Sequence, residues 1–212
     1  MLIVCPELPE RKYPGAEWYQ EGGIMDTDGH IREKEERTFS AADRIVAEVK
    51  NRTQAAGKII LFGHSAGGQF VHRWALLGGK KNVDVIAVAN SGWFTMPDRD
   101  IDYPYGIKNV GITDEELGEA FAKPVILFMG EKDVERKPPF RDTPEADAQG
   151  MNRMERCTNY FRQCKAKAEE LRVPFRWKLE TVEGTAHQGV KMAEGAAAYI
   201  FGKSSEDGNR RV

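Results

Sequence analysis

The 212-residue sequence predicts an α/β fold with three layers, in which helices cover both faces of a mostly parallel sheet of about five strands. Short apolar runs of strand length alternate along the chain with segments in which apolar residues recur every three or four positions. Most of those runs lack polar alternation, as strands of a parallel sheet do when both faces are buried. Neither repeats nor linkers divide the chain, so we expect one domain at residues 1–202 and a polar tail at 203–212.

Composition argues against several classes of protein. A hydrophobic fraction of 41% and a charged fraction of 30% are ordinary for a soluble globular chain. The net charge of −2 would not attract nucleic acid or an anionic membrane, and no apolar stretch is long enough to span a bilayer. We therefore expect neither nucleic acid nor a membrane as a partner.

The cysteines predict a reduced protein. Cys5, Cys157 and Cys164 are odd in number and lack the Cys-x-x-Cys spacing of zinc sites. Cys157 and Cys164 fall on one face of a predicted helix, where a core position is the simplest interpretation. We expect a cytoplasmic protein with no cofactor and no metal, unless a signal peptide lies upstream of the first residue.

The predicted elements begin with a strand. An apolar run at residues 2–5 has strand character, and a turn-rich segment with several aromatic residues follows it. Residues 38–50 predict a helix with an apolar stripe. Ser40 and Asp43 have the spacing of a capping box near the start of that helix.

Four more apolar runs have strand length, at residues 59–62, 83–89, 124–129 and 175–181. The last run alternates apolar and polar residues, which indicates one buried face, as in an edge strand. Helical periodicity separates and follows these runs, at residues 70–77, 113–123, 143–171 and 190–201. Thr113 and Glu116 form a second capping box, Pro144 occupies a first helical position, and Gly150 interrupts the helix that follows it.

The junction after residues 59–62 is the sharpest functional signal. It reads Gly63-His64-Ser65-Ala66-Gly67 and fits Gly-x-Ser-x-Gly, the turn that holds a nucleophilic serine between a strand and a helix. A glycine-rich turn of this kind can also be a tight connection or a phosphate cradle. The sequence lacks both G-x-G-x-x-G and Gly-Lys-Ser/Thr, so a dinucleotide or Walker-type loop is disfavoured. We expect Ser65 to be a nucleophile.

His187 is the histidine best placed to activate Ser65 among the four in the chain. His64 is the immediate neighbour of Ser65, and adjacent side chains diverge at a sharp turn. His72 lies about 10 Å along the following helix at the α-helical rise. His30 is in a charged loop. His187 follows the last predicted strand and is flanked by glycines, which places it at the carboxyl edge of the sheet.

Asp133 is the preferred carboxylate partner. It follows the strand at residues 124–129 in a glycine-led loop, again at the carboxyl edge. Asp98 is the serious rival, Glu131 is a weaker one, and Asp84 opens its strand and so lies at the opposite edge. Together these residues would perform acyl transfer on an ester through an acyl-enzyme, with the Ala66 backbone N–H as one oxyanion donor.

Six segments carry a resemblance to a known family: IVCPELPERKYPG, ILFGHSAGGQFVHRW, ANSGWFTMPDRDIDYPYG, VILFMGEKDVE, TPEADAQGMNRMERC and VEGTAHQGVKMAE. They are similar to segments of bacterial α/β-hydrolases described as polyhydroxybutyrate-depolymerase-like or as esterases. The resemblance implies a serine hydrolase acting on a small-molecule acyl substrate, with Ser65, Asp133 and His187 as the catalytic triad. It also implies an acyl pocket near Trp93, Met96, Pro97 and Tyr105.

The resemblance fails before residues 2–5. Family members carry further strands there, including a His-Gly loop that supplies a second oxyanion donor, and one of those strands lies between the counterparts of 2–5 and 59–62. We therefore expect an N-terminally truncated α/β-hydrolase. Two other interpretations stay open: a catalytically impaired binding protein of the same fold, and a flavodoxin-like fold whose glycine loop binds phosphate.

Overall fold

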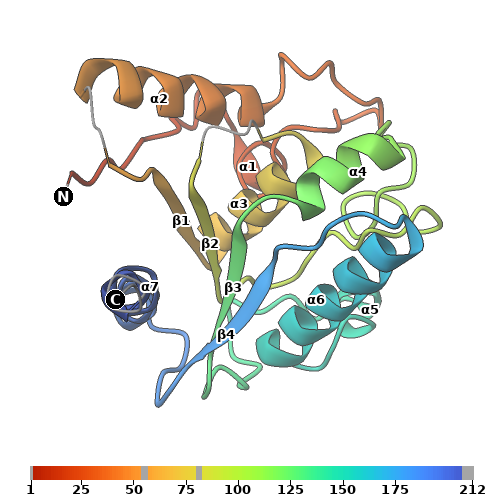
Figure 1. Ribbon diagram of the computed structural model, residues 1–212. Helices are drawn as coiled ribbons and strands as arrows, with labels where there is room; N and C mark the ends of the chain where they lie inside the picture. The colour runs from red at the N-terminus through yellow and green to blue at the C-terminus, as the bar shows by residue number, and fades with distance from the viewer. Residues whose placement is uncertain (1, 54–56, 80–82, 207–212) are drawn as a thin grey trace.

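The computed structural model describes residues 2–53, 57–79 and 83–206, with side chains up to residue 202. Its centre is a sheet of four parallel strands, arranged in space in the order in which they occur in the chain. The strands are β1 (Ile60–His64), β2 (Val85–Ala89), β3 (Val125–Gly130) and β4 (Lys178–Val182). Because all four run in the same direction, their carboxyl ends meet at one edge of the sheet (Figure 1).

The helices cover both faces of this sheet, which confirms the predicted three layers (Figure 1). α3 (Ala66–Leu77), α4 (Asp114–Phe121) and α6 (Arg153–Glu170) form one layer, and α7 (Gly189–Glu206) lies against the other face. α2 (Thr38–Thr53) runs above the amino-terminal end of the sheet as drawn in Figure 1. The two short helices are α1 (Gly15–Trp18) and α5 (Pro144–Asp147).

The core is divided by the sheet into a large and a small part. Ile86 and Val88 on β2 face the larger part, which lies under α3, α4 and α6. Their neighbours Ala87 and Ala89 face the smaller part, where Met192 of α7 is fully buried. Successive residues of a strand point to opposite faces, so these apolar runs supply both parts of the core at once.

The predicted strand at residues 2–5 is wrong. These residues form no strand, and Leu2 and Ile3 are 63% and 71% exposed. The sheet of the described residues accordingly has four strands rather than five. An apolar run becomes a strand only when another backbone satisfies its N–H and C=O groups, and the described part of the chain brings no such partner to this run.

The strand before Ser65 is also less buried than predicted. β1 is an edge strand that pairs only with β2 in the described sheet, and Phe62 on it is 37% exposed. β3, in contrast, has neighbours on both sides and is buried at every position. Strand burial thus depends on the place of a strand in the sheet, which the run of apolar residues does not encode.

Helix starts follow the sequence signals in two of three cases. Thr113 and Glu116 form the predicted capping box at the start of α4, and Thr143 caps α5 with Pro144 at its first position. The capping box at Ser40 and Asp43 is wrong, because α2 already begins at Thr38 and the Ser40 hydroxyl donates to the Glu35 carbonyl. Among the described residues, no helix combines the length and the apolar character needed to cross a bilayer.

Candidate active site

Ser65 occupies a sharp junction between β1 and α3. Its backbone has φ 55° and ψ −114°, a conformation that L-residues rarely adopt and that is held here by its neighbours. Its N–H donates to the Ala89 carbonyl at 3.0 Å, and its own carbonyl accepts from the Gln69 N–H at 2.9 Å. Gly63 permits the tight approach, because a Cβ there would lie 2.3 Å from the Gly67 carbonyl oxygen.

Three side chains named from the sequence meet at the carboxyl edge of the sheet. His187 Nε2 lies 2.9 Å from Ser65 Oγ, and His187 Nδ1 lies 2.7 Å from Asp133 Oδ2. An ionised carboxylate can only accept, so Nδ1–H donates to Asp133 and Nε2 is left to accept the Ser65 hydroxyl proton. The Asp133 side chain is 4% exposed and the His187 side chain is 27% exposed, so the serine end of this chain of hydrogen bonds faces the solvent side.

The other histidines have different surroundings. His72 is fully buried, with Nδ1 3.1 Å from the Gly68 carbonyl oxygen and Nε2 accepting from the Thr95 N–H. Burial, followed by the charge of Arg73, lowers the pKa of His72 well below its ordinary value. It therefore serves as a neutral part of the core. The His30 side chain is 79% exposed, as its charged loop predicts.

The rival carboxylates are engaged elsewhere. Asp98 accepts from the N–H of Asp100, and Glu131 accepts from the N–H of Gly184 at 2.7 Å. Asp84 accepts from the Ile59 N–H at the start of the strands, at the opposite edge from Ser65. Of the four carboxylates considered, Asp133 is the one that hydrogen-bonds to His187 among the described residues.

His64 takes part in the site in a way that the motif does not predict. Its ring does not point away but packs on His187, with the ring centroids 4.8 Å apart. Its Nε2 is buried and has no hydrogen-bond partner among the described residues. Burial and then the proximity of His187 lower the pKa of His64 to about 4, so the ring is neutral at pH 7. A neutral, partly buried imidazole thus forms one wall against His187.

Two buried polar residues adjoin the site that neither motif nor periodicity indicated. Arg153, on α6, donates to Asp133 Oδ1 at 3.2 Å, on the oxygen that His187 does not contact. Asn90, directly after β2, contacts the loops that carry Asp133 and His187. The contacts of both residues come from segments that are distant in the sequence, so only the tertiary structure shows them. The one available sequence signal was the position of Asn90 directly after a central strand.

The predicted acyl-pocket residues lie in the loop after β2. Trp93, Met96 and Pro97 are buried, and Trp93 stacks against the guanidinium of Arg73 at 4.1 Å. Tyr105 is half-buried and lines a cavity of about 560 Å³. Their role in holding an acyl group stays a prediction.

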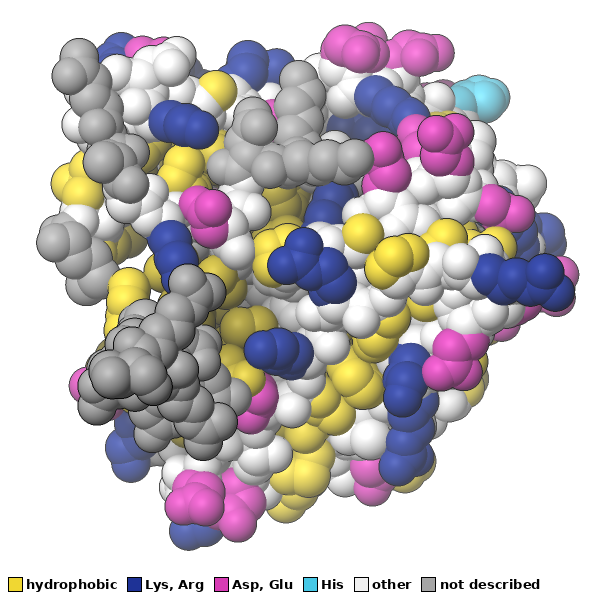
Figure 2. Space-filling view, viewed as in Figure 1, with side chains coloured by type: hydrophobic (Ala, Val, Ile, Leu, Met, Phe, Trp, Pro, Cys, Tyr) yellow, Lys and Arg dark blue, Asp and Glu magenta, His cyan; other side chains and the backbone are white. Residues whose placement is uncertain are grey.

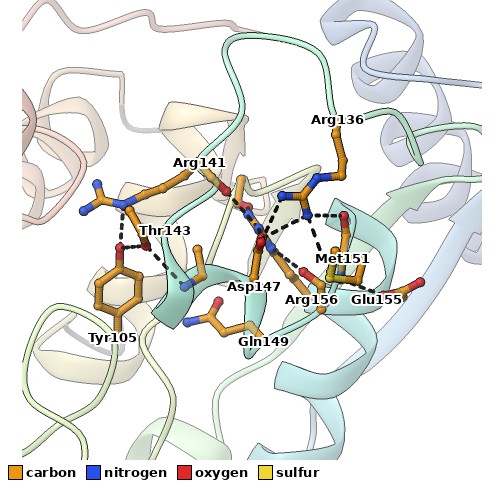
Figure 3. Close-up of polar contacts among 12 residues, drawn as sticks. Tyr105, Arg136, Arg141, Thr143, Asp147, Gln149, Met151, Glu155 and Arg156 are labelled. Carbon is orange, nitrogen blue, oxygen red and sulfur yellow. Dashed lines mark hydrogen bonds and ion pairs between the residues drawn. The ribbon is translucent and has the colours of Figure 1, made fainter.

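Tyr105 also belongs to a polar network that joins this loop to residues 136–156 (Figure 3). Its hydroxyl lies 2.7 Å from Thr143 Oγ1 and accepts from Arg141 Nε. Farther along, Asp147 bridges the guanidinium groups of Arg136 and Arg156. The Tyr105 side of the cavity wall is therefore held by Thr143 and Arg141 from the 136–156 segment.

The first residue of α3 is the predicted oxyanion donor. The N–H of Ala66 is among the helix-start groups that have no acceptor within their own helix, and the positive end of the helix dipole lies there. The Tyr19 hydroxyl approaches the same helix start, 3.4 Å from where a Cβ on Gly67 would stand. This places a phenol from the N-terminal segment beside the serine turn.

A possible metal-binding group lies elsewhere among the described residues. Asp26, Asp28 and His30 bring their ligand atoms within 4.8 Å of one another in the turn between Met25 and Ile31. Asp28 and His30 are exposed, and the backbone N–H groups of both donate to Asp26 Oδ1. These bonds make the three residues part of a hydrogen-bonded turn.

Comparison with known proteins identifies the family. No protein-family model matches the chain, and no curated protein matches it. A solved structure of poly(aspartic acid) hydrolase-1 from Sphingomonas sp. KT-1 is similar, with 32% identity and a TM-score of 0.86, over 92% of this chain and 75% of that one. The poly(3-hydroxybutyrate) depolymerase LpqC from Bordetella parapertussis is similar with 30% identity and a TM-score of 0.85, over 93% and 68% of the two chains. The protein is therefore a hydrolase that belongs to the esterase-like α/β-hydrolase family of these two enzymes.

Proposed function

We propose that the protein is a serine hydrolase that cleaves an acyl ester of a small molecule with Ser65, His187 and Asp133 as its catalytic triad. The observation that carries this proposal is the continuous chain of hydrogen bonds from Ser65 through His187 to Asp133, 2.9 Å and 2.7 Å long. Ser65 has the strained backbone of a nucleophile elbow, which presents its hydroxyl at the edge of the sheet.

The reaction follows from these positions. His187 Nε2 takes the Ser65 proton while Oγ attacks the ester carbonyl carbon, and the carbonyl oxygen becomes an oxyanion. His187 then gives that proton to the leaving alcohol as the C–O bond breaks, which leaves an acyl-enzyme. Water repeats the sequence: His187 removes its proton, the hydroxide oxygen attacks the acyl carbon, and Ser65 leaves with the proton as the acid departs. Asp133 stabilises the positive imidazole at both stages.

The oxyanion needs donors near Ser65. The Ala66 N–H stands at the start of α3 and supplies one, assisted by the helix dipole. Removing a single donor of this kind typically costs about 3–4 kcal/mol of transition-state stabilisation. This magnitude makes Ala66 a necessary part of the proposed site.

The acyl group would lie beside the loop after β2, where Trp93, Met96, Pro97 and Tyr105 are expected to shape the pocket. The two similar enzymes are named for poly(aspartic acid) and poly(3-hydroxybutyrate). A substrate panel therefore includes short p-nitrophenyl esters, oligomers of 3-hydroxybutyrate and oligomers of aspartate.

A cytoplasmic location is proposed because all three cysteines are free, and one of them, Cys5, is exposed.

The test is covalent labelling followed by turnover. A fluorophosphonate should label the wild-type protein at Ser65, and p-nitrophenyl acetate should give a burst of p-nitrophenol as the acyl-enzyme forms. Ser65→Ala should abolish both, and His187→Ala should slow both by about three orders of magnitude or more. His30→Ala, an exposed histidine outside the site, is the matched control and should behave as wild type.

An unlabelled wild-type protein that is folded at the assay temperature would contradict the proposal. The same holds for Ser65→Ala if it turns over esters at the wild-type rate. Absence of labelling would favour the binding-protein interpretation, in which the fold is kept and the chemistry is not, whereas undiminished turnover by Ser65→Ala would show that another group performs the hydrolysis.

A further inference from the structure

Asn90 lies at the centre of the carboxyl edge of the sheet. It follows β2 directly, and β2 stands between the strand that leads to Ser65 and the strand that leads to Asp133. Its side chain is buried, with the residue 5% exposed. A buried amide must satisfy both its donor and its acceptor to avoid a substantial loss of stability.

The side chain of Asn90 satisfies both groups with two different loops. Its Oδ1 accepts from the N–H of Gly130, the last residue of β3, at 2.8 Å. Its Nδ2 donates at 3.1 Å to the carbonyl of Ala186, the residue before His187. One amide thus contacts the start of the loop that carries Asp133 and the residue next to His187.

The backbone of Asn90 is fitted to this position. Its φ is 43°, in the left-handed region that asparagine tolerates better than most residues. Its N–H donates to the Phe128 carbonyl on β3 at 3.1 Å. This backbone conformation directs the side chain between the two loops. A positive φ costs conformational energy, and a residue that only filled space would not need to adopt it.

The two loops are already joined to each other without Asn90. The Lys132 N–H donates to the Thr185 carbonyl at 2.8 Å, and Glu131 Oε2 accepts from the Gly184 N–H. These bonds fix Asp133 and His187 relative to one another. They do not connect either residue to Ser65, which lies between β1 and α3.

Beside the packing of His64 on His187, a hydrogen-bonded connection runs through the end of β2. The Ala89 carbonyl accepts from the Ser65 N–H at 3.0 Å, and the next residue, Asn90, contacts the other two loops. Ala89 and Asn90, two consecutive residues, therefore connect the serine turn by hydrogen bonds to the loops that carry Asp133 and His187. No other asparagine with a positive φ among the described residues is buried, since Asn109 is exposed.

We propose that Asn90 is a positioning residue that sets the distance between Ser65 Oγ and His187 Nε2. The inference rests on the proposed serine hydrolase function. In this proposal Asn90 positions Ser65 relative to His187. The hydrogen bond between His187 and Asp133 is maintained by the direct contacts between the two loops that carry them. Loss of Asn90 should therefore weaken one hydrogen bond of the triad and preserve the other.

Two variants separate the side chain from the backbone. Asn90→Gly removes both side-chain hydrogen bonds and adopts a positive φ without strain. Asn90→Asp keeps an oxygen for the Gly130 N–H and loses the donor to Ala186. Asn109→Gly is the matched control, because Asn109 has φ 60° in an exposed loop. Thermal unfolding of each variant is measured first, and rates are taken below the transition.

Four readouts distinguish positioning from a general loss of structure. We expect Asn90→Gly and Asn90→Asp to slow fluorophosphonate labelling of Ser65 and to lower kcat by about tenfold to a hundredfold, since small displacements of reacting groups cost rates of that order. KM should change less than about threefold, because the pocket is untouched. The low-field proton resonance of His187 Nδ1–H should persist, and Asn109→Gly should match wild type in every readout.

The inference is overturned if folded Asn90→Gly or Asn90→Asp is labelled at the wild-type rate. It is also overturned if the low-field resonance disappears in both variants, because Asn90 would then support the whole site rather than one distance. If Asn90→Gly is unfolded at the assay temperature, Asn90→Asp decides by the same criteria. Failure of the proposed function has another signature, which is undiminished turnover by Ser65→Ala or His187→Ala.

Discussion

Arg153 Nη1 lies 3.2 Å from Asp133 Oδ1, the carboxylate oxygen that His187 leaves free. The two side chains are 6% and 4% exposed, so this is a buried ion pair at the base of the site. Arg153 Nη2 also donates to the Pro139 carbonyl, which anchors the guanidinium to the loop above α6. Asp133 is thereby held between a histidine and an arginine, and its two oxygens have separate partners.

Removing Arg153 should destabilise the protein and slow the reaction. Arg153→Met leaves the Asp133 charge buried with one partner fewer, and breaking a buried pair in this way costs about 3–5 kcal/mol of unfolding free energy. Arg153→Lys keeps the positive charge but not the planar guanidinium with its several donors, and it should lose less stability and activity than Arg153→Met. Urea unfolding and kcat check both, with Arg162→Met, an exposed arginine on the same helix, as the control that should stay near wild type. Equal stability of Arg153→Met and wild type would contradict this role.

A side chain at Gly130 should push the His187 loop out of place. A Cβ there would lie 2.6 Å from the Thr185 carbonyl oxygen and 2.8 Å from that of Ala186, both backbone atoms. We expect Gly130→Ala to lower kcat by about tenfold or more, since His187 follows directly on Ala186. Gly57→Ala, where a Cβ would meet nothing within 4 Å, should leave kcat unchanged. Wild-type turnover by Gly130→Ala would show that the loop can move away without harm.

His64 should make the folded state sensitive to acid. Burial lowers its pKa to about 4, whereas an unfolded histidine titrates near 6.5, so the unfolded state binds more protons between these values. The contribution of His64 to stability is therefore complete above about pH 6.5 and is lost as the pH falls toward 4. We expect His64→Gln to reduce the loss of unfolding free energy between pH 7 and pH 5 by about 1 kcal/mol, the partial exposure of the ring limiting the effect.

Urea unfolding at the two pH values measures this difference directly. His72 shifts in the same direction and is present in both proteins, so its contribution cancels in the comparison. His30→Gln, at an exposed position, serves as the control. An identical pH dependence of wild type and His64→Gln would refute the assignment.

Arg156 should be essential for the segment that carries the cavity wall. The side chain is fully buried and donates to Asp147 and to the Arg141 carbonyl (Figure 3). It also donates to the carbonyls of Gly150 and Gly92. Arg156→Met leaves those carbonyls without their donor, and we expect a loss of about 3 kcal/mol or more by thermal or urea unfolding. Asp147→Asn should cost less, because the Asp147 side chain is 28% exposed and the carbonyl bonds of Arg156 remain. The reverse order of the two losses would be inconsistent with this network.

Lys and Arg side chains are interspersed with Asp and Glu over the face shown in Figure 2, in keeping with the net charge of −2. The field that would steer a polyanion to this face is therefore weak.

The amino-acid sequence by itself determined the local structure that creates the site. The apolar run, the glycines and the helical period around Ser65 predict a strand, a sharp turn and a helix, and all three are present. Asp133 and His187 could be placed at the same edge because parallel strands end together, a rule that needs only the order of strands and helices. These features depend on residues that are close together in the sequence, so the sequence is sufficient to predict them.

The tertiary structure alone decided which strands have partners and which polar groups are buried together. The apolar run at residues 2–5 resembles a strand but pairs with nothing described, whereas β3 is buried because two other strands flank it. Likewise, Asn90, Arg153 and His64 acquire their contacts from segments distant along the chain. Strand pairing and the satisfaction of buried polar groups are properties of apposed backbones, so no pattern within one segment can specify them.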